Sequence, residues 1–156
     1  EFSKGILVLL MFCGACAGST GGGFKISRLL ILCKAIPKQL SLVIHPREVK
    51  VIRMDGKPID HNTLRSTNVY LAIYFFILLV STLLISVDNF NLTTNFTAVA
   101  STLNNIGPGL DGVGPTRNFG MYSDFSKFVL MFDMLAGRLE LYPLLILFMP
   151  SLWRRK

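Results

Sequence analysis

Apolar residues gather in three stretches that are separated by polar and basic segments. The middle stretch, Asn68 to Val87, has no charged side chain, and its 20 residues would span roughly 30 Å as a helix, the thickness of a bilayer core. The first stretch, Gly5 to Ala17, is too short to cross alone and runs into the glycine-rich residues 18–23. The third, Phe125 to Met149, is long enough but carries Lys127, Asp133, Arg138 and Glu140. The pattern predicts membrane helices.

Composition agrees with an all-α integral membrane protein. Of the 156 residues, 51% are hydrophobic and only 16% are charged, whereas about a quarter are charged in soluble domains. The mean hydropathy is +0.52. This excludes intrinsic disorder, and three cysteines are too few for a disulfide-rich module. The net charge of +7 lies between the apolar runs, so it indicates membrane topology and no nucleic-acid partner.

The basic residues predict the orientation in the membrane. Between Lys25 and Arg65 there are nine Lys and Arg against three acids, whereas the connection from Asp88 to Ser123 holds only Arg117. The positive-inside rule places residues 43–67 and the C-terminus in the cytoplasm and residues 88–120 outside. Solvation of loops, the alternative, explains the basic residues but not their asymmetry. No secretory signal precedes the first stretch, and we expect the chain to be the C-terminal piece of a longer protein.

The outer connection has a composition typical of a pore loop. Asn91 to Asn95 offer helix-capping side chains, Phe96 to Leu103 form a short semi-apolar helix, and the glycines and proline of Asn104 to Leu110 end it. Irregular backbone at membrane depth is tolerated only where it is buried in protein or lines a watery cavity. We therefore expect a re-entrant pore loop, in which the short helix points its C-terminal carbonyl end inward and favours a cation there. An apolar extracellular Gly/Pro loop is the alternative.

Several short motifs occur in a fixed order along the whole chain: Gly14–Lys25, Ile44–Arg47, Gly56–Pro58, Ser101–Gly109, Val113–Thr116, Asp124–Lys127 and Gly137–Glu140. Together they resemble the Trk/Ktr/HKT superfamily of potassium transporters, and within it the bacterial Trk-type membrane subunit. Each motif alone is weak, but their combination is specific.

The resemblance implies four repeats of membrane helix, pore loop and membrane helix around one axis, of which this chain holds the last part. It assigns residues 1–42 to the inner helix of the third repeat, broken at 18–23; 43–67 to a basic cytoplasmic linker; 68–87 to the outer helix of the fourth repeat; 88–120 to the pore helix (94–103) and filter loop (104–110); and 121–156 to the inner helix (121–149) and basic C-terminus.

A re-entrant pore helix followed by an extended filter strand is implied by the same resemblance. The resemblance maps backbone carbonyl ligands onto Asn104, Asn105, Ile106, Gly107 and Pro108, with potassium held at Asn105, Ile106 and Gly107. Potassium must lose its hydration shell, which carbonyl oxygens can replace. Turning successive carbonyls toward one axis needs backbone angles that glycine reaches without a Cβ clash. Pro108 departs from the potassium-channel pattern and lacks an N–H.

Two gating elements are also implied by the resemblance. It places Arg138 in the pore below the filter, as an electrostatic barrier, and makes an intramembrane gating loop of Gly18, Ser19, Thr20, Gly21, Gly22 and Gly23. A cation at this depth must face protein or water rather than lipid. A structural ion pair of Arg138 with Asp133 or Glu140 is the alternative for the first element. A plain kink in a membrane helix is the alternative for the second.

The function expected from the resemblance is potassium uptake across the bacterial inner membrane, either channel-like or coupled as a symport. Potassium is the substrate, no cofactor is expected in this chain, and no catalytic constellation indicates an enzyme. The expected partners are the lipid bilayer, the remaining repeats of the subunit, a second subunit in a homodimer and a cytosolic nucleotide-binding regulatory ring. The alternative function is a non-conducting membrane anchor or assembly subunit.

Overall fold

The computed structural model describes residues 2–14, 24–45, 51–54 and 57–139. Its helices are α1 (Phe2–Phe12), α2 (Ile26–Ile44), α3 (His61–Ile85), α4 (Leu92–Leu103) and α5 (Asp124–Leu139), with 3₁₀ turns η1 (Ser86–Asp88), η2 (Asp111–Val113) and η3 (Phe119–Met121). Two-residue strands, β1 (Arg53–Met54) and β2 (Lys57–Pro58), pair in an antiparallel hairpin. The described part of the chain is therefore helical apart from this hairpin and the connecting segments.

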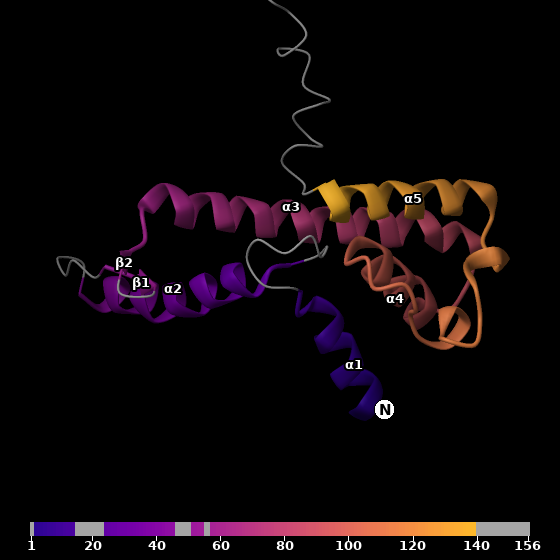
Figure 1. The fold of residues 1–156 in the computed structure, drawn as a ribbon, viewed down its shortest axis with the longest axis horizontal. Helices are drawn as coiled ribbons and strands as arrows, with labels where there is room; N and C mark the ends of the chain where they lie inside the picture. The colour runs from indigo at the N-terminus through magenta and orange to yellow at the C-terminus, as the bar shows by residue number, and fades with distance from the viewer. Residues whose placement is uncertain (1, 15–23, 46–50, 55–56, 140–156) are drawn as a thin grey trace, which may run out of the picture.

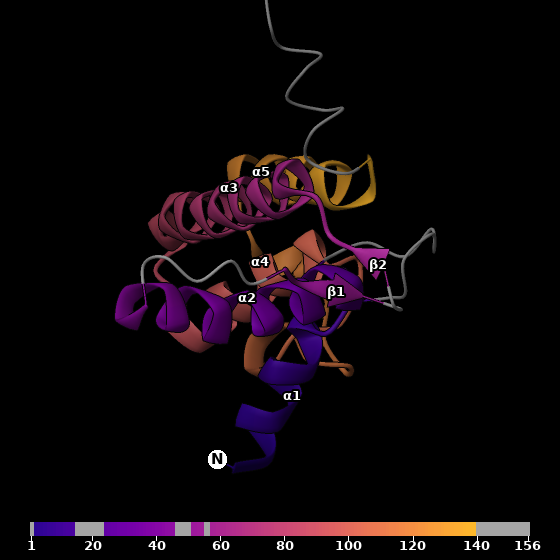
Figure 2. The same ribbon diagram turned by 90° about the vertical axis from the view of Figure 1, so that its left-hand side faces the viewer.

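The helices form two layers. α3 and α5 lie side by side, and α4 is inclined against both of them, as Figure 1 and the perpendicular view of Figure 2 show. On the other side of α4, α1 reaches its surface, while α2 packs against the first half of α3. The short helix α4 is thus contacted by α1, α3 and α5, which come from both ends of the described chain.

Helix α3 combines an apolar span with a polar first turn. Its span Asn62–Asp88 is the one described segment that is long and apolar enough to cross a membrane. The helix begins at His61, earlier than the start at residue 68 that the sequence predicts, because polar residues continue it backward: the hydroxyls of Ser66 and Thr67 donate to the carbonyl of Thr63. The basic linker between helices shortens accordingly, since α2 continues to Ile44.

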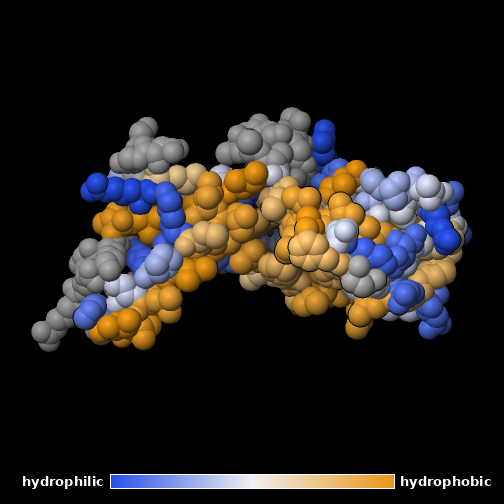
Figure 3. Space-filling view, turned by 90° about the horizontal axis from the view of Figure 1, so that it is seen from below, coloured by the Kyte–Doolittle hydropathy of each residue, from blue (hydrophilic) through white to orange (hydrophobic). Residues whose placement is uncertain are grey.

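Apolar side chains cover the middle of the surface in Figure 3, whereas polar ones gather at the two ends of the long axis. One end carries the β1–β2 hairpin, which Lys34 of α2 holds by donating from Nζ to the carbonyl of Arg53 at 3.0 Å. Large exposed apolar side chains of α3 and α5 include Phe75, Phe76, Leu79, Leu83, Phe128, Met131 and Leu135. This distribution suits a chain whose middle faces lipid or other apolar segments.

Small residues let α5 approach the end of α4 closely. Ala98 and Ala100 of α4 and Ala136 of α5 are fully buried. At Gly137 the approach is so tight that a Cβ atom would lie 1.9 Å from the carbonyl oxygen of Leu103. Apolar burial drives helix association only weakly inside a bilayer, where van der Waals packing between small residues takes its place.

Gly137→Ala should therefore destabilise the protein, by about 1–3 kcal/mol, because the new methyl group overlaps a backbone oxygen that cannot rotate away. Thermal unfolding of the purified protein in detergent measures the effect. Gly5→Ala is the matched control, since no described atom lies within 4 Å of a Cβ built there. Equal midpoints for the two variants would contradict the close approach.

Candidate functional site

The short helix α4 is buried although half of its residues are polar. Its buried residues are Thr94, Asn95, Thr97, Ala98, Val99, Ala100, Ser101, Thr102 and Leu103. The hydroxyls of Thr97, Ser101 and Thr102 donate to carbonyls one turn earlier in the helix, so they require no outside partner. Of the stretch Asn91 to Asn95, which was expected to offer capping side chains, Asn91 occupies the N-cap position, but its side chain makes no cap hydrogen bond.

Tyr122, at the other edge of the loop, holds the N-terminal part of this helix. Its hydroxyl donates to Oδ1 of Asn95 at 2.9 Å, and Nδ2 of Asn95 donates to the carbonyl of Phe90. Burial and the nearby carboxylate of Asp88 raise the pKa of the Tyr122 phenol to about 12, so it is a neutral donor at ordinary pH. The beginning of α4 is thereby fixed to the segment that precedes α5.

After α4 the chain turns and runs back along the same helix. The amide of Ile106 donates to the carbonyl of Ser101 at 2.9 Å, and the amide of Leu110 donates to the hydroxyl of Thr97 at 3.0 Å. Residues later in the segment are thus bound to residues earlier in the helix. This return places residues 104–110 beside α4, in the irregular conformation that the glycines and proline predict.

The backbone of residues 104–110 is unusual in two ways. Asn105 has φ +54° and Gly107 has φ +107°, a region that favours glycine. Within the described residues, moreover, no hydrogen bond reaches the carbonyl oxygens from Asn104 to Gly109, although several amides of the segment are bonded. Backbone carbonyls are strong acceptors that are normally satisfied when buried. Ile106, Gly107 and Pro108 are exposed, so their carbonyl oxygens are open to a partner outside the described residues.

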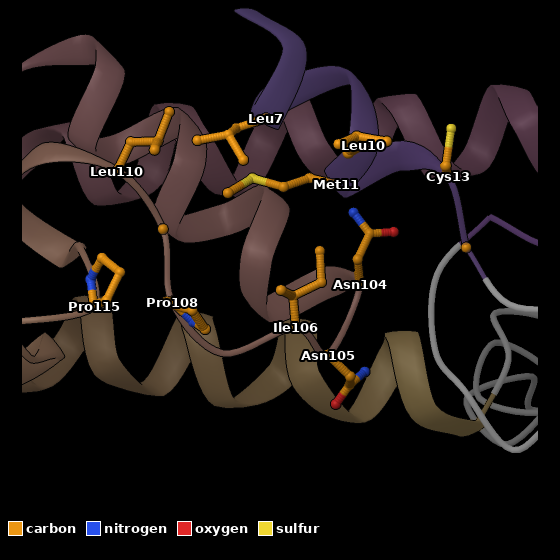
Figure 4. A pocket seen from close by; sticks show the side chains of 12 residues that line it. Leu7, Leu10, Met11, Cys13, Asn104, Asn105, Ile106, Pro108, Leu110 and Pro115 are labelled. Atoms are coloured by element: carbon orange, nitrogen blue, oxygen red, sulfur yellow. The ribbon is translucent and has the colours of Figure 1, made fainter. Parts of the chain in front are cut away.

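A cavity of about 550 Å³ lies on one side of this segment, between it and α1. Figure 4 shows Asn104 and Ile106 on the side of Met11, whereas Asn105 points the opposite way, toward α5. There Asn105 donates from Nδ2 to the carbonyl of Met134 at 3.3 Å. A second cavity, of about 440 Å³, is lined by Gly107 and by α5 residues that include Lys127. The segment is therefore accessible from two sides.

The predicted gating residues have different outcomes. Arg138 is exposed at the end of α5, next to Gly137, which contacts the junction of α4 and the 104–110 segment. Gly18, Ser19, Thr20, Gly21, Gly22 and Gly23 lie outside the described residues. The residues that flank this stretch are close together, because the amide of Gly14 donates to the carbonyl of Phe24 at 3.0 Å. Gly14 also lines the cavity beside Asn104 and Ile106.

Asp133 is engaged by a serine. Its carboxylate is fully buried, and Oδ1 accepts a hydrogen bond from the Ser81 hydroxyl of α3 at 2.7 Å, while Oδ2 has no partner among the described residues. Asp133 and Arg138 form no ion pair in the described part of the chain, and Glu140 lies outside it. Sequence spacing relates residues on one helix, whereas this partner is 52 residues away.

Sequence reasoning missed the side chains that hold the segment. Tyr74 of α3 donates from its hydroxyl to Oδ1 of Asn104 at 2.9 Å, and Thr97 accepts from the amide of Leu110. Tyr74 follows Tyr70 by one helical turn inside an otherwise apolar stretch. A buried tyrosine normally finds a hydrogen-bond partner, so this pair was a readable signal. The identity of the partner was not, because it depends on tertiary packing.

Comparisons with known proteins agree with this geometry. The family model described as "TrkH: Cation transport protein" matches residues 1–155. The Trk system potassium uptake protein TrkH of Vibrio parahaemolyticus is 38% identical over 149 residues, which are 96% of this chain and 30% of the relative. The Escherichia coli K12 protein of the same name is 37% identical with the same coverage. TrkG of E. coli K12 is 33% identical over 148 residues, 95% of this chain and 30% of the relative.

The crystal structure of the potassium transporter TrkH from Vibrio parahaemolyticus superimposes with a TM-score of 0.86 at 37% identity, covering 98% of this chain and 32% of that one. The fold and the sequence matches together place the chain in a class of helical membrane proteins. The chain belongs to the TrkH family of cation transport proteins, which confirms the resemblance drawn from its motifs. It spans about 30% of the length of the curated relatives it matches.

Ser81→Ala should lower the free energy of unfolding by about 1–3 kcal/mol, because it leaves the buried carboxyl of Asp133 without its described donor. Thermal or denaturant unfolding in detergent measures the loss. Ser86→Ala is the control, since the hydroxyl of Ser86 is exposed and donates to the carbonyl of Thr82 one turn earlier. The double variant Ser81→Ala/Asp133→Leu should recover part of the loss, and no recovery would show that the carboxyl is not the cause.

Proposed function

We propose that this chain forms part of a potassium uptake transporter, in which potassium is the substrate and passes along the backbone carbonyls of Asn104, Asn105, Ile106, Gly107 and Pro108. The supporting observation is the row of carbonyl oxygens that no hydrogen bond reaches within the described residues. The proposed ion positions lie at Asn105, Ile106 and Gly107. The names of the relatives, which are potassium uptake proteins, agree with this substrate.

Physical chemistry favours a monovalent cation at such a site. Neutral carbonyl oxygens can replace the hydration shell of potassium without binding it so tightly that it cannot leave. The amides of Ile106 and Leu110, which would repel a cation, are bonded to α4 instead. The carbonyl end of α4 adds a favourable dipole beside the same residues. In this proposal α4 is a re-entrant pore helix and residues 104–110 are the filter.

Gating in this proposal uses Arg138 and the loop of residues 18–23. Arg138 follows Gly137, which contacts the junction of α4 and the proposed filter, so a guanidinium there lies within reach of the permeation path. Gly14 and Phe24, which flank the loop, are joined beside the cavity that Asn104 and Ile106 line. A non-conducting anchor, the alternative, requires neither a row of unbonded carbonyls nor an arginine beside it.

The proposal extends to topology and assembly. The β1–β2 end of the molecule would face the cytoplasm, with residues 43–67, and the η2–η3 end would face outward, with residues 88–120. The remaining repeats of a full-length subunit would complete the pore, and a homodimer regulated by a cytosolic nucleotide-binding ring is the proposed assembly. The basic hairpin that Lys34 holds against α2 offers a surface for such a ring.

Growth of a potassium-uptake-deficient bacterial strain at low potassium tests the transport function. The full-length subunit that carries this chain should restore growth, and lack of rescue by correctly inserted wild-type protein would overturn the proposal.

In the same subunit, Gly107→Ser should abolish potassium uptake or its discrimination against sodium without preventing membrane insertion. A Cβ at Gly107 meets no described atom within 4 Å, so the defect arises from its φ of +107°, which a side chain disfavours. Uptake per inserted protein, in potassium with and without sodium, measures it. Gly114→Ser, in the same loop with φ −65°, is the control. Unchanged discrimination in Gly107→Ser would refute the filter assignment.

Arg138→Ala should raise the potassium flux several-fold while leaving the amount of folded protein near normal, because a positive charge beside the path repels the passing cation. The amount of folded protein is measured by size-exclusion chromatography in detergent, and potassium uptake is divided by that amount. This separates a change in flux from a change in folding. A drop in folded yield with no gain in flux would identify Arg138 as a structural residue.

A further inference from the structure

The ring of Tyr74 is held rigidly inside an aromatic cluster. The residue is 2% exposed, and its ring lies at centroid distances of 5.7–6.4 Å from four neighbours. These come from α1, the α1–α2 connection and α3 itself: Phe12, Phe24, Tyr70 and Phe75. A tyrosine has only two side-chain torsions, and here packing fixes both. The position of its hydroxyl is therefore determined by three separate segments of the fold.

This hydroxyl is bound to the first residue of the proposed filter. It donates to Oδ1 of Asn104 at 2.9 Å, and the same amide group donates from Nδ2 to the carbonyl of Ala100 at 2.8 Å. The amide of Asn104 is buried, so water does not replace either bond freely. Asn104 thus connects the outer helix α3 to the last turn of α4 at the point where the helix ends.

The residues that follow Asn104 include the two positive-φ positions of the segment, Asn105 and Gly107. Asn105 comes next with φ +54°, and its side chain is bound on the opposite side, to the carbonyl of Met134 in α5. The start of the segment is therefore held between α3 and α5 by two side-chain amides. A displacement of Asn104 would shift the carbonyls of the residues after it, because they continue from the same backbone.

We propose that Tyr74 is a positioning residue for ion discrimination, which it controls through Asn104 without touching the ion. This inference rests on the proposed function of the segment and adds a residue to it from outside the filter loop. Carbonyl geometry decides how well an ion of a given size replaces its hydration shell, so loosening Asn104 should weaken discrimination before it weakens folding.

The chain contains a matched control for this bond. Tyr122 makes the same kind of hydrogen bond, also 2.9 Å long and also to an asparagine side chain. Its partner is Asn95, near the start of α4, whereas Asn104 follows the last residue of that helix. Both tyrosines are 2% exposed. Replacing either tyrosine by phenylalanine removes one hydroxyl from a buried ring. The two variants therefore differ chiefly in which end of α4 loses a hydrogen bond.

The test compares Tyr74→Phe with Tyr122→Phe in the full-length subunit, by measuring uptake of potassium in competition with sodium and normalising to folded protein. Tyr74→Phe should reduce the potassium-to-sodium preference roughly two- to tenfold, the range expected for loss of one hydrogen bond. Tyr122→Phe should leave the preference within twofold of wild type. Equal preferences in the two variants, or a loss of folded protein alone, would overturn the proposal.

A double-variant cycle with Asn104→Ala tests the route of the effect. If Tyr74 acts through Asn104, Tyr74→Phe should have no further effect on the preference in the Asn104→Ala background. Additive losses would refute that route. Failure of the wild-type subunit to take up potassium would instead overturn the proposed function. If the wild type discriminates normally and Tyr74→Phe has the same potassium-to-sodium preference, only the role of Tyr74 is overturned.

Discussion

The contact between Gly137 of α5 and the carbonyl of Leu103 fixes how closely the long helix approaches the end of the short one. Because the two backbones touch at that point, the Asn105 side chain reaches the carbonyl of Met134, one turn earlier on α5. The same approach places Arg138 directly beyond the junction. A side chain at residue 137 would separate α5 from α4 and lengthen the Asn105 bond with it. The geometry of the segment thus depends on a residue that belongs to neither α4 nor the loop.

The second constraint is the satisfaction of polar groups in largely apolar surroundings. Helix α4 meets it internally, since Thr97, Ser101 and Thr102 donate back to carbonyls of the same helix. The returning segment meets it with its amides alone, through the carbonyl of Ser101 and the hydroxyl of Thr97. The donors and acceptors of this segment are therefore treated differently: the amides of Asn105, Ile106 and Leu110 bond to α4, whereas the carbonyls from Asn104 to Gly109 accept from no described residue.

Local sequence signals predicted which helices form, but not where each helix begins or which side chains it contacts. Hydropathy located α3 but not its first residues, because it detects the length of an apolar stretch and not the end of a helix. The predicted start was residue 68, whereas α3 begins at His61. The helix predicted at 94–103 corresponds to α4, which begins two residues earlier. The inner helix predicted from residue 121 begins at Asp124 and is described as far as Leu139. Glycine at 107 announced an unusual backbone angle, because glycine tolerates what other residues avoid.

The partners of Asn104, Asn105 and Asp133 were beyond prediction for a common reason. They lie 29 to 52 residues away along the chain, on helices whose rotation about their own axes is set only when they pack. Side-chain amides at the first two positions look dispensable in a sequence, where only their backbone carbonyls attract interest. In the structure these two side-chain amides fix the start of the segment. The amide of Asn104 is bonded to α3, and the amide of Asn105 is bonded to α5. A loop that only docked a partner would gain nothing from being held on both sides at its first two residues, whereas a row of carbonyls that must keep its spacing requires it.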